Sequence, residues 1–249
     1  MFRIIARCDI KGKNLIKGIR YEGVRVIGDP GEFAKKYYIH GVDEIVYIDA
    51  VASLYERSSL APLVENSVKN IFVPISVGGG INDLESARSI LKSGAEKVII
   101  NTAAVNNPDL IRILSEEFGR QCIVISIQAK KRDQYWEALT HCGRTPTGID
   151  VHKWMEIVQT LGAGEIILTS VDCDGTMNGI DLDLIRSISG IVDLPIIASG
   201  GFCNEDPIED IAREGVISGI AIGASLHRGN VSIPSIKGRL RDNGIKVRV

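Results

Sequence analysis

The chain has 249 residues, of which 45% are hydrophobic and 24% charged, with 29 lysines and arginines against 31 aspartates and glutamates. This composition is typical of globular proteins and excludes a disordered or collagen-like chain. With a net charge of −2, the chain lacks the excess of basic residues that binding to nucleic acid or to an anionic membrane surface requires. No apolar run reaches the ~18 residues of a membrane span, and Met1–Arg7 lacks the long uncharged stretch of a signal peptide. We therefore expect a cytoplasmic protein.

Short runs rich in β-branched residues predict eight strands. In chain order they cover residues 4–10, 44–48, 73–77, 97–100, 122–127, 165–169, 195–198 and 217–222. Segments with helical periodicity, such as 83–92 and 108–118, separate most of them. Strands that alternate with helices at this spacing favour a closed (β/α)8 barrel, the TIM-barrel architecture of the α/β class, over an open sheet.

The two halves of the chain resemble each other. Val73–Gly80 is similar to Leu194–Gly201 at an offset of 121 positions, and the same offset pairs Glu44 with Glu165. The segment 97–102 matches 218–225 with two extra residues, and 9–11 matches 128–130 two residues tighter. We interpret residues 1–249 as a single barrel domain built from two related half-barrels, about 1–120 and 121–249.

The cysteines predict no chemistry. Cys8, Cys122, Cys142, Cys173 and Cys203 are odd in number and never spaced as CxxC, so neither a zinc site nor a disulfide framework is indicated. His141 and Cys142 are adjacent on one predicted strand, where neighbours point to opposite faces, so they do not make a nucleophile and its base. We expect no metal and no cofactor.

Small residues follow several predicted strands, at the end of the barrel where the sites of such folds lie. They are Gly78–Gly80, Asn101–Thr102, Asp174–Thr176, Gly200–Gly201 and Gly223–Ser225. Glycine lets a phosphate approach backbone N–H groups, and the start of the next helix favours an anion, although a plain tight turn explains any single pair equally well. Because the signal occurs in both halves, we predict two phosphate sites on opposite sides of one mouth, and a substrate with a phosphate at each end.

Between these sites, the first strand ends with Asp9 and the fifth with Gln128. A carboxylate at a barrel strand end is a candidate general acid or base. The alternative is that Asp9 forms an ion pair with Arg7 or with a nearby lysine.

At these residues the chain resembles a known family over essentially its whole length. The matching segments are 8–18, Gly28–Pro30, Asp43–Asp49, Val77–Ile81, Lys97–Ala103, Gly162–Ser170, Asp174–Thr176 and Ala198–Gly201. They are similar to the cyclase subunits of imidazole glycerol phosphate synthase, the HisF-type barrels of histidine biosynthesis.

The resemblance implies a lyase that works as a heterodimer with a HisH-type glutaminase docked on the N-terminal face of the barrel. Ammonia from this partner would pass through the barrel to a bisphosphorylated ribulosyl-formimino substrate and close an imidazole ring, releasing an aminoimidazole carboxamide ribotide. It also implies phosphate contacts at Gly80, Asn101 and Thr102 on one side and at Asp174, Gly175, Gly201, Ala224 and Ser225 on the other, a catalytic Lys17 in a mobile first loop, and an ammonia gate of Arg3, Glu44, Lys97 and Glu165. Without the resemblance, the last four charges are interpreted as a salt-bridged rim.

The chain departs from the family at its mouth. The family uses two aspartates for acid–base chemistry, whereas this chain has Asp9 and Gln128, and a primary amide does not exchange a proton near neutral pH. Arg7 replaces the usual cysteine and would hold Asp9 ionised. Ile99 places an apolar side chain inside the barrel, where the family has a small polar residue.

Two functions follow. One is the cyclase reaction, with Asp9 and a loop residue sharing the proton transfers. The alternative is a paralogue without ring closure that channels ammonia for acetamidino modification of a surface-polysaccharide sugar, which the altered first loop 20–30 favours.

Overall fold

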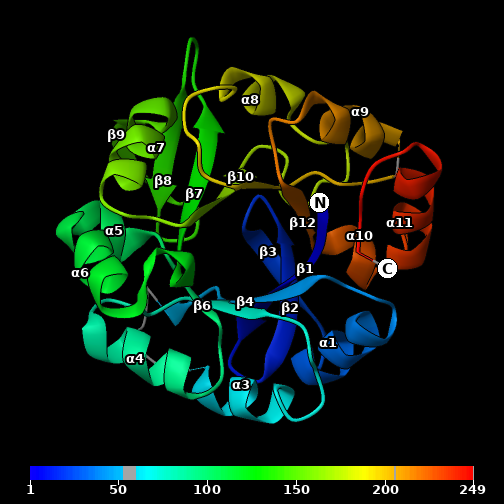
Figure 1. The fold of residues 1–249 in the computed structure, drawn as a ribbon, viewed down its shortest axis with the longest axis horizontal. Helices are drawn as coiled ribbons and strands as arrows, with labels where there is room; N and C mark the ends of the chain where they lie inside the picture. The colour runs from blue at the N-terminus through cyan, green and yellow to red at the C-terminus, as the bar shows by residue number, and fades with distance from the viewer. Residues whose placement is uncertain (53–59, 205, 249) are drawn as a thin grey trace.

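Eight parallel strands close into a barrel in the computed structural model, which describes residues 1–52, 60–204 and 206–248. They are β1 (Arg3–Lys11), β4 (Glu44–Asp49), β5 (Ile75–Gly78), β6 (Lys97–Ile100), β7 (Ile123–Lys131), β10 (Glu165–Ser170), β11 (Ile196–Ser199) and β12 (Gly219–Ile222). Each pairs in parallel with the next, and β12 pairs with β1, which closes the ring. The predicted (β/α)8 barrel is confirmed, with strand ends shifted by a few residues (Figure 1).

Helices surround the barrel (Figure 1). They are α1 (Pro30–Ile39), α3 (Ala61–Ser67), α4 (Leu84–Lys92), α5 (Thr102–Asn106), α6 (Asp109–Phe118), α7 (Val151–Thr160), α8 (Leu182–Ser187), α9 (Asp206–Glu214), α10 (Ala224–His227) and α11 (Ile233–Asp242), with a 3-10 turn at Arg120–Cys122. The two helices predicted at 83–92 and 108–118 are α4 and α6, and Asp83 caps α4 in a capping box with Ser86. No helix in the part of the chain that the structure describes is long and apolar enough to cross a membrane.

Two hairpins extend the barrel beyond its eight strands. Strands β2 (Asn14–Ile19) and β3 (Glu22–Gly28) follow β1, and β8 (Trp136–Thr140) and β9 (Thr145–Asp150) follow β7. In both cases the first hairpin strand pairs antiparallel with the barrel strand before it. The order of barrel strand, hairpin and three further barrel strands therefore occurs twice, as the predicted half-barrels require, and their common origin stays a prediction.

The interior of the barrel holds an apolar layer of its own, distinct from the larger core between sheet and helices. This apolar ring consists of Ile5, Val46, Ile99, Val124, Ile167, Ile197 and Ala221. Alternate residues of a strand point to opposite faces, so one residue from each of seven barrel strands contributes to this layer. Ile99 lies inside the barrel, as predicted.

His227 on α10 is buried beside the mouth of the barrel. Its Nδ1 lies 2.6 Å from the Tyr37 hydroxyl, and its ring packs edge-on against Phe33. Burial, together with the positive charge of Lys17, lowers the pKa of His227 to about 4. The fold therefore accepts the neutral imidazole and disfavours the charged one.

This burial predicts a pH dependence of stability. The unfolded chain protonates His227 near its ordinary pKa of about 6.5, whereas the folded chain does so only near pH 4. Above about pH 6.5 the imidazole is neutral in both states, and the neutral His227 then makes its full contribution to the free energy of unfolding. As the pH falls from about 6.5 to about 4, this group should remove up to roughly 3 kcal/mol from the free energy of unfolding. Urea denaturation of the wild type and of His227→Asn across this range measures the difference.

His40→Gln is the matched control, because His40 is exposed at the end of α1. Its pH profile should follow that of the wild type. Equal pH profiles for wild type and His227→Asn would show that this histidine does not limit stability in acid.

Candidate functional site

Two glycine turns lie at the C-terminal ends of the strands, one after β5 and one after β11. Gly79 and Gly80 have φ of 99° and 71°, and Gly200 and Gly201 have φ of 98° and 86°. Only glycine adopts these values without strain, and a Cβ atom at Gly79 or Gly201 would meet a backbone carbonyl oxygen. At two places around one mouth, the backbone therefore has no side chain to cover it.

The first glycine turn forms one wall of an open pocket, the first rim pocket. Gly80, Asn101 and Thr102 all line it, as the sequence predicts for one phosphate site. The Asn101 amide donates to the Leu139 carbonyl over 3.2 Å, and the Thr102 hydroxyl accepts the backbone N–H of His141 over 3.1 Å. The end of β8 and the residue that follows it thus orient both side chains.

The second glycine turn belongs to a second rim pocket. Of the residues predicted for the other phosphate site, Asp174, Gly175, Gly201 and Ala224 line it. Ser225 does not: it is fully buried, and its hydroxyl donates to the Phe202 carbonyl. Among the described residues that line the first pocket, only Asp49 is charged. The second pocket is lined by two cations, Arg7 and Lys17, in addition to Asp174.

A cluster of buried charges adjoins the second pocket, which Arg7, Lys17 and Asp174 line. The Asp9 carboxylate accepts from Arg7 Nε over 2.9 Å and from Lys17 Nζ over 2.7 Å, and Lys17 Nζ also donates to Asp174 over 3.1 Å. Burial alone would raise the pKa of Asp9, but the two cations lower it well below its usual range. Asp9 is therefore an ionised carboxylate, and it pairs with both Arg7 and a lysine, as the sequence alternatives proposed.

Lys17 lies on strand β2 rather than in an open loop, and it is only 5% exposed. Asp9 and Asp174 hold its ammonium group at the mouth, and β2 also pairs with β1 through its backbone. The resemblance implied a mobile first loop at this position, whereas the structure has Lys17 in a paired strand.

Tyr21 is a mouth residue that the sequence did not indicate. It follows Arg20 in the hairpin turn, and both have positive φ, of 51° and 63°. The Tyr21 hydroxyl accepts from Arg7 Nη2 over 3.1 Å, and the guanidinium lies 5.7 Å from the ring centre. Burial raises the pKa of Tyr21 to about 12, so the phenol stays protonated at neutral pH.

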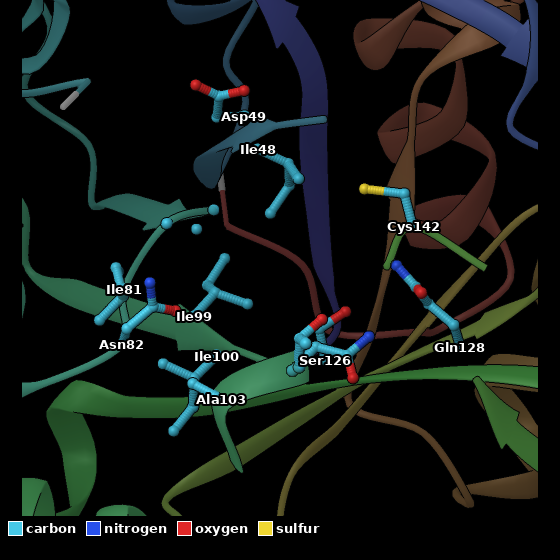
Figure 2. Close-up of a pocket in the computed structure, with 15 residues that line it drawn as sticks. Ile48, Asp49, Ile81, Asn82, Ile99, Ile100, Ala103, Ser126, Gln128 and Cys142 are labelled. Atoms are coloured by element: carbon cyan, nitrogen blue, oxygen red, sulfur yellow. The ribbon is translucent and has the colours of Figure 1, made fainter. Parts of the chain in front are cut away.

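Gln128 faces the first rim pocket from β7, and Cys142 lies on the same side of that pocket, opposite Ile81 and Asn82 (Figure 2). The Gln128 Oε1 atom accepts the backbone N–H of Gly143 over 2.6 Å. The Cys142 thiol donates to the Ala50 carbonyl over 3.1 Å. The sequence assigned Cys142 no role, and an isolated cysteine in a turn carries no signal that would have placed it at the mouth.

At the other end of the barrel, the four predicted gate residues form a closed ionic ring. Each is the first residue of its strand, as expected. Arg3 contacts Glu44 over 3.3 Å and also pairs with Glu165, and Lys97 donates to these carboxylates over 3.0 and 2.7 Å. Burial lowers the pKa of Lys97, but the two carboxylates outweigh it and raise that pKa.

The barrel interior is therefore layered. From the N-terminal end it contains the ionic ring, then the apolar ring, then the Arg7 guanidinium, and finally Asp9 at the mouth. Along the axis of the barrel, an ionic layer is thus followed by an apolar layer and then by a second ionic layer.

Comparison with known proteins agrees with this geometry. The family described as "Histidine biosynthesis protein" matches residues 3–232. A protein of Pyrococcus furiosus named imidazole glycerol phosphate synthase subunit HisF is 44% identical over 248 residues, 99% of this chain and 98% of its own length. Proteins of the same name from Legionella pneumophila and Myxococcus xanthus are 51% identical over 200 residues and 40% identical over 246 residues. They cover 80% and 99% of this chain, and 94% and 97% of their own lengths.

The match covers the barrel from its first strand to the short helix beside the second rim pocket. Both rim pockets, the buried charge cluster and the ionic ring lie within it. The chain therefore belongs to the histidine biosynthesis protein family.

Proposed function

We propose that this chain is the cyclase subunit of an imidazole glycerol phosphate synthase. The observation that carries the proposal is an ionised Asp9 at a mouth that also holds two glycine-lined pockets, in a chain that a relative of this name matches over 99% of its length. The surface-polysaccharide alternative is not favoured, since these relatives are named for the histidine-pathway enzyme.

The two rim pockets would hold the two phosphate groups of the substrate. In the first, the backbone at Gly80 and the side chains of Asn101 and Thr102 offer hydrogen bonds. In the second, the backbone at Gly175 and Gly201 does so. This arrangement is supported by the two turns, which present N–H groups at opposite sides of the same opening.

Proton transfer would centre on Asp9. An ionised carboxylate acts as a base, and its contact with the Lys17 ammonium over 2.7 Å supplies the nearest proton donor. Gln128 would contribute only hydrogen bonds, because an amide does not titrate. The reaction would therefore run with one carboxylate and a lysine where relatives of this chain are expected to use two aspartates.

Ammonia would enter through the ionic ring from a glutaminase partner. The face around this entrance exposes large apolar side chains: Phe72 is 73% exposed and Ile39 is 69% exposed. Ile39 ends α1 and Phe72 precedes β5, so both lie at the end of the barrel where the strands begin. An exposed apolar surface around a central opening supports docking of a HisH-type partner at this face.

Turnover is the direct test. The purified chain with the bisphosphorylated substrate and an ammonium salt should release the imidazole product and the aminoimidazole ribotide. Asp9→Asn should lower the rate by ~10²–10⁴-fold, because it removes the base while keeping the size of the side chain. Asp109→Asn, on the exposed face of α6, should leave the rate unchanged. No product above background from the wild type would overturn the proposal.

Gln128→Asp tests the role of the amide. A carboxylate at this position can exchange a proton, so cyclisation should rise by about tenfold or more, a barrier change of ~1.4 kcal/mol. Gln128→Asn, which keeps the amide on the shorter side chain, is the matched control. If both variants change the rate equally, side-chain length rather than proton exchange is responsible.

Phe72→Glu tests the docking face. A charge in the apolar contact should weaken binding of the glutaminase by about tenfold or more, measured by titration calorimetry. Tyr135→Glu is the control, because Tyr135 is 40% exposed in the β7–β8 hairpin at the opposite end of the barrel. Equal binding by both variants would place the partner elsewhere.

A further inference from the structure

An open groove with three arginines lies between the β2–β3 hairpin and the end of α10. The arginines are Arg20 in the hairpin turn, Arg25 on β3 and Arg228, which follows α10, and all three are exposed. None of them lines either rim pocket. Lys17 lines both this groove and the second rim pocket, so the two adjoin each other. We call this surface the arginine groove.

The charges of the arginine groove are not balanced within the chain. In the part of the chain that the structure describes, no carboxylate forms an ion pair with any of the three arginines. The charge of Lys17 is already balanced, because Asp9 and Asp174 both contact its ammonium group. Among the described lining residues, Glu22 is the only acidic one. Three arginines and one glutamate therefore leave an excess of two positive charges in the groove.

The register of the hairpin makes this excess unfavourable. Arg25 on β3 lies directly opposite Lys17 on β2. Residues opposite each other in an antiparallel pair point to the same face, and like charges in this position destabilise the pair. The two carboxylates that balance Lys17 do not reach Arg25. An anion bound in the groove would remove the repulsion that the hairpin alone leaves in place.

Two of the arginines are held in position while their donors stay available. The backbone N–H of Arg20 donates to the Asp174 carbonyl over 2.8 Å, and its Nε donates to the Asp172 carbonyl over 3.0 Å. No described residue accepts a hydrogen bond from the two Nη nitrogens of Arg20. Arg228 Nη1 lies 3.9 Å from the Met177 sulfur, which is a weak acceptor that a phosphate oxygen would replace.

We propose that the arginine groove is a binding site for a diphosphate group. A guanidinium presents parallel N–H donors that match two oxygens of one phosphoryl group, and three guanidinium groups can hold two phosphoryl groups together. The negative charges of a diphosphate offset the positive excess of the groove. A ligand held by Arg20, Arg25 and Arg228 would also link the hairpin to the end of α10. This site goes beyond the proposed function, which places one phosphate group in each rim pocket.

Titration calorimetry of the full chain with sodium pyrophosphate tests the site, in about 0.1 M sodium chloride and without divalent metal. Pyrophosphate should bind with a Kd below about 1 mM, and about tenfold or more tighter than inorganic phosphate. Arg25→Gln and Arg228→Gln should each weaken this binding by about tenfold or more, since each removes one charged fork from the groove. Arg241→Gln is the matched control, because Arg241 is exposed on α11 and does not line the groove, and it should bind as the wild type does.

Three results would overturn the proposal. They are no binding of pyrophosphate, equal affinity for pyrophosphate and phosphate, and full affinity in both Arg25→Gln and Arg228→Gln. The last result would place the diphosphate in a rim pocket. The titration needs no turnover, so its outcome and that of the cyclase assay are independent of each other.

The same titration distinguishes two sources of a diphosphate group. Ile19 lines the groove and is 53% exposed, so it offers an apolar contact to a nucleoside. Binding of adenosine diphosphate about threefold or more tighter than pyrophosphate would support a nucleoside diphosphate as the ligand, and equal affinity would support inorganic diphosphate. Adenosine carries no phosphate and should not bind. Adenosine that bound as tightly as adenosine diphosphate would contradict recognition of the phosphates.

Discussion

The ion pairs of Asp9 with Arg7 and Lys17 hold the working end of this barrel together. Two cations and two carboxylates are buried there, and each charge is stable in that environment only because an opposite charge lies within hydrogen-bonding distance. The cluster joins β1 to the β2–β3 hairpin through Lys17 and to the segment after β10 through Asp174. The interaction that keeps Asp9 ionised thus also fastens the hairpin, whose first strand pairs with β1, to the mouth.

The same cluster makes the two rim pockets unequal. Both present a glycine turn with left-handed backbone, so both offer N–H groups to an anion. Among the residues that the structure describes, however, only the second pocket is lined by cations, since Arg7 and Lys17 reach it and not the first. An anion in the second pocket interacts with the charges that fix Asp9, whereas one in the first interacts mainly with backbone and neutral side chains. The two ends of a bisphosphorylated ligand would therefore contribute differently to binding.

The layers of the barrel interior below the mouth differ in polarity for a physical reason. The ionic ring at the entrance neutralises itself, because two cations face two carboxylates. The apolar ring above it offers an ion no hydrogen bonds, so an ion would lose hydration without replacement. Arg7 then adds a fixed charge stabilised by Asp9 and two hydroxyls.

The sequence by itself determined the barrel, because strands and helices alternate with local periodicities that do not depend on distant contacts. It also located the glycine turns, the four strand-initial charges and Asp9, since strand ends in a parallel barrel meet at the same edge. The internal similarity of the two halves predicted that their sites would face each other across one mouth. These features follow from residue type and spacing alone.

Only the tertiary structure decided which partners the buried charges have. It brought Lys17 from a segment expected to be mobile into contact with Asp174, 157 positions away. It paired the Ser225 hydroxyl with the Phe202 carbonyl, and it placed Cys142 at the first pocket and Tyr21, Thr169 and Ser199 around Arg7. Such contacts join residues remote in the chain. Their geometry depends on the closure of the barrel and on the cost of leaving a buried charge unpaired, and no local pattern in the sequence encodes either.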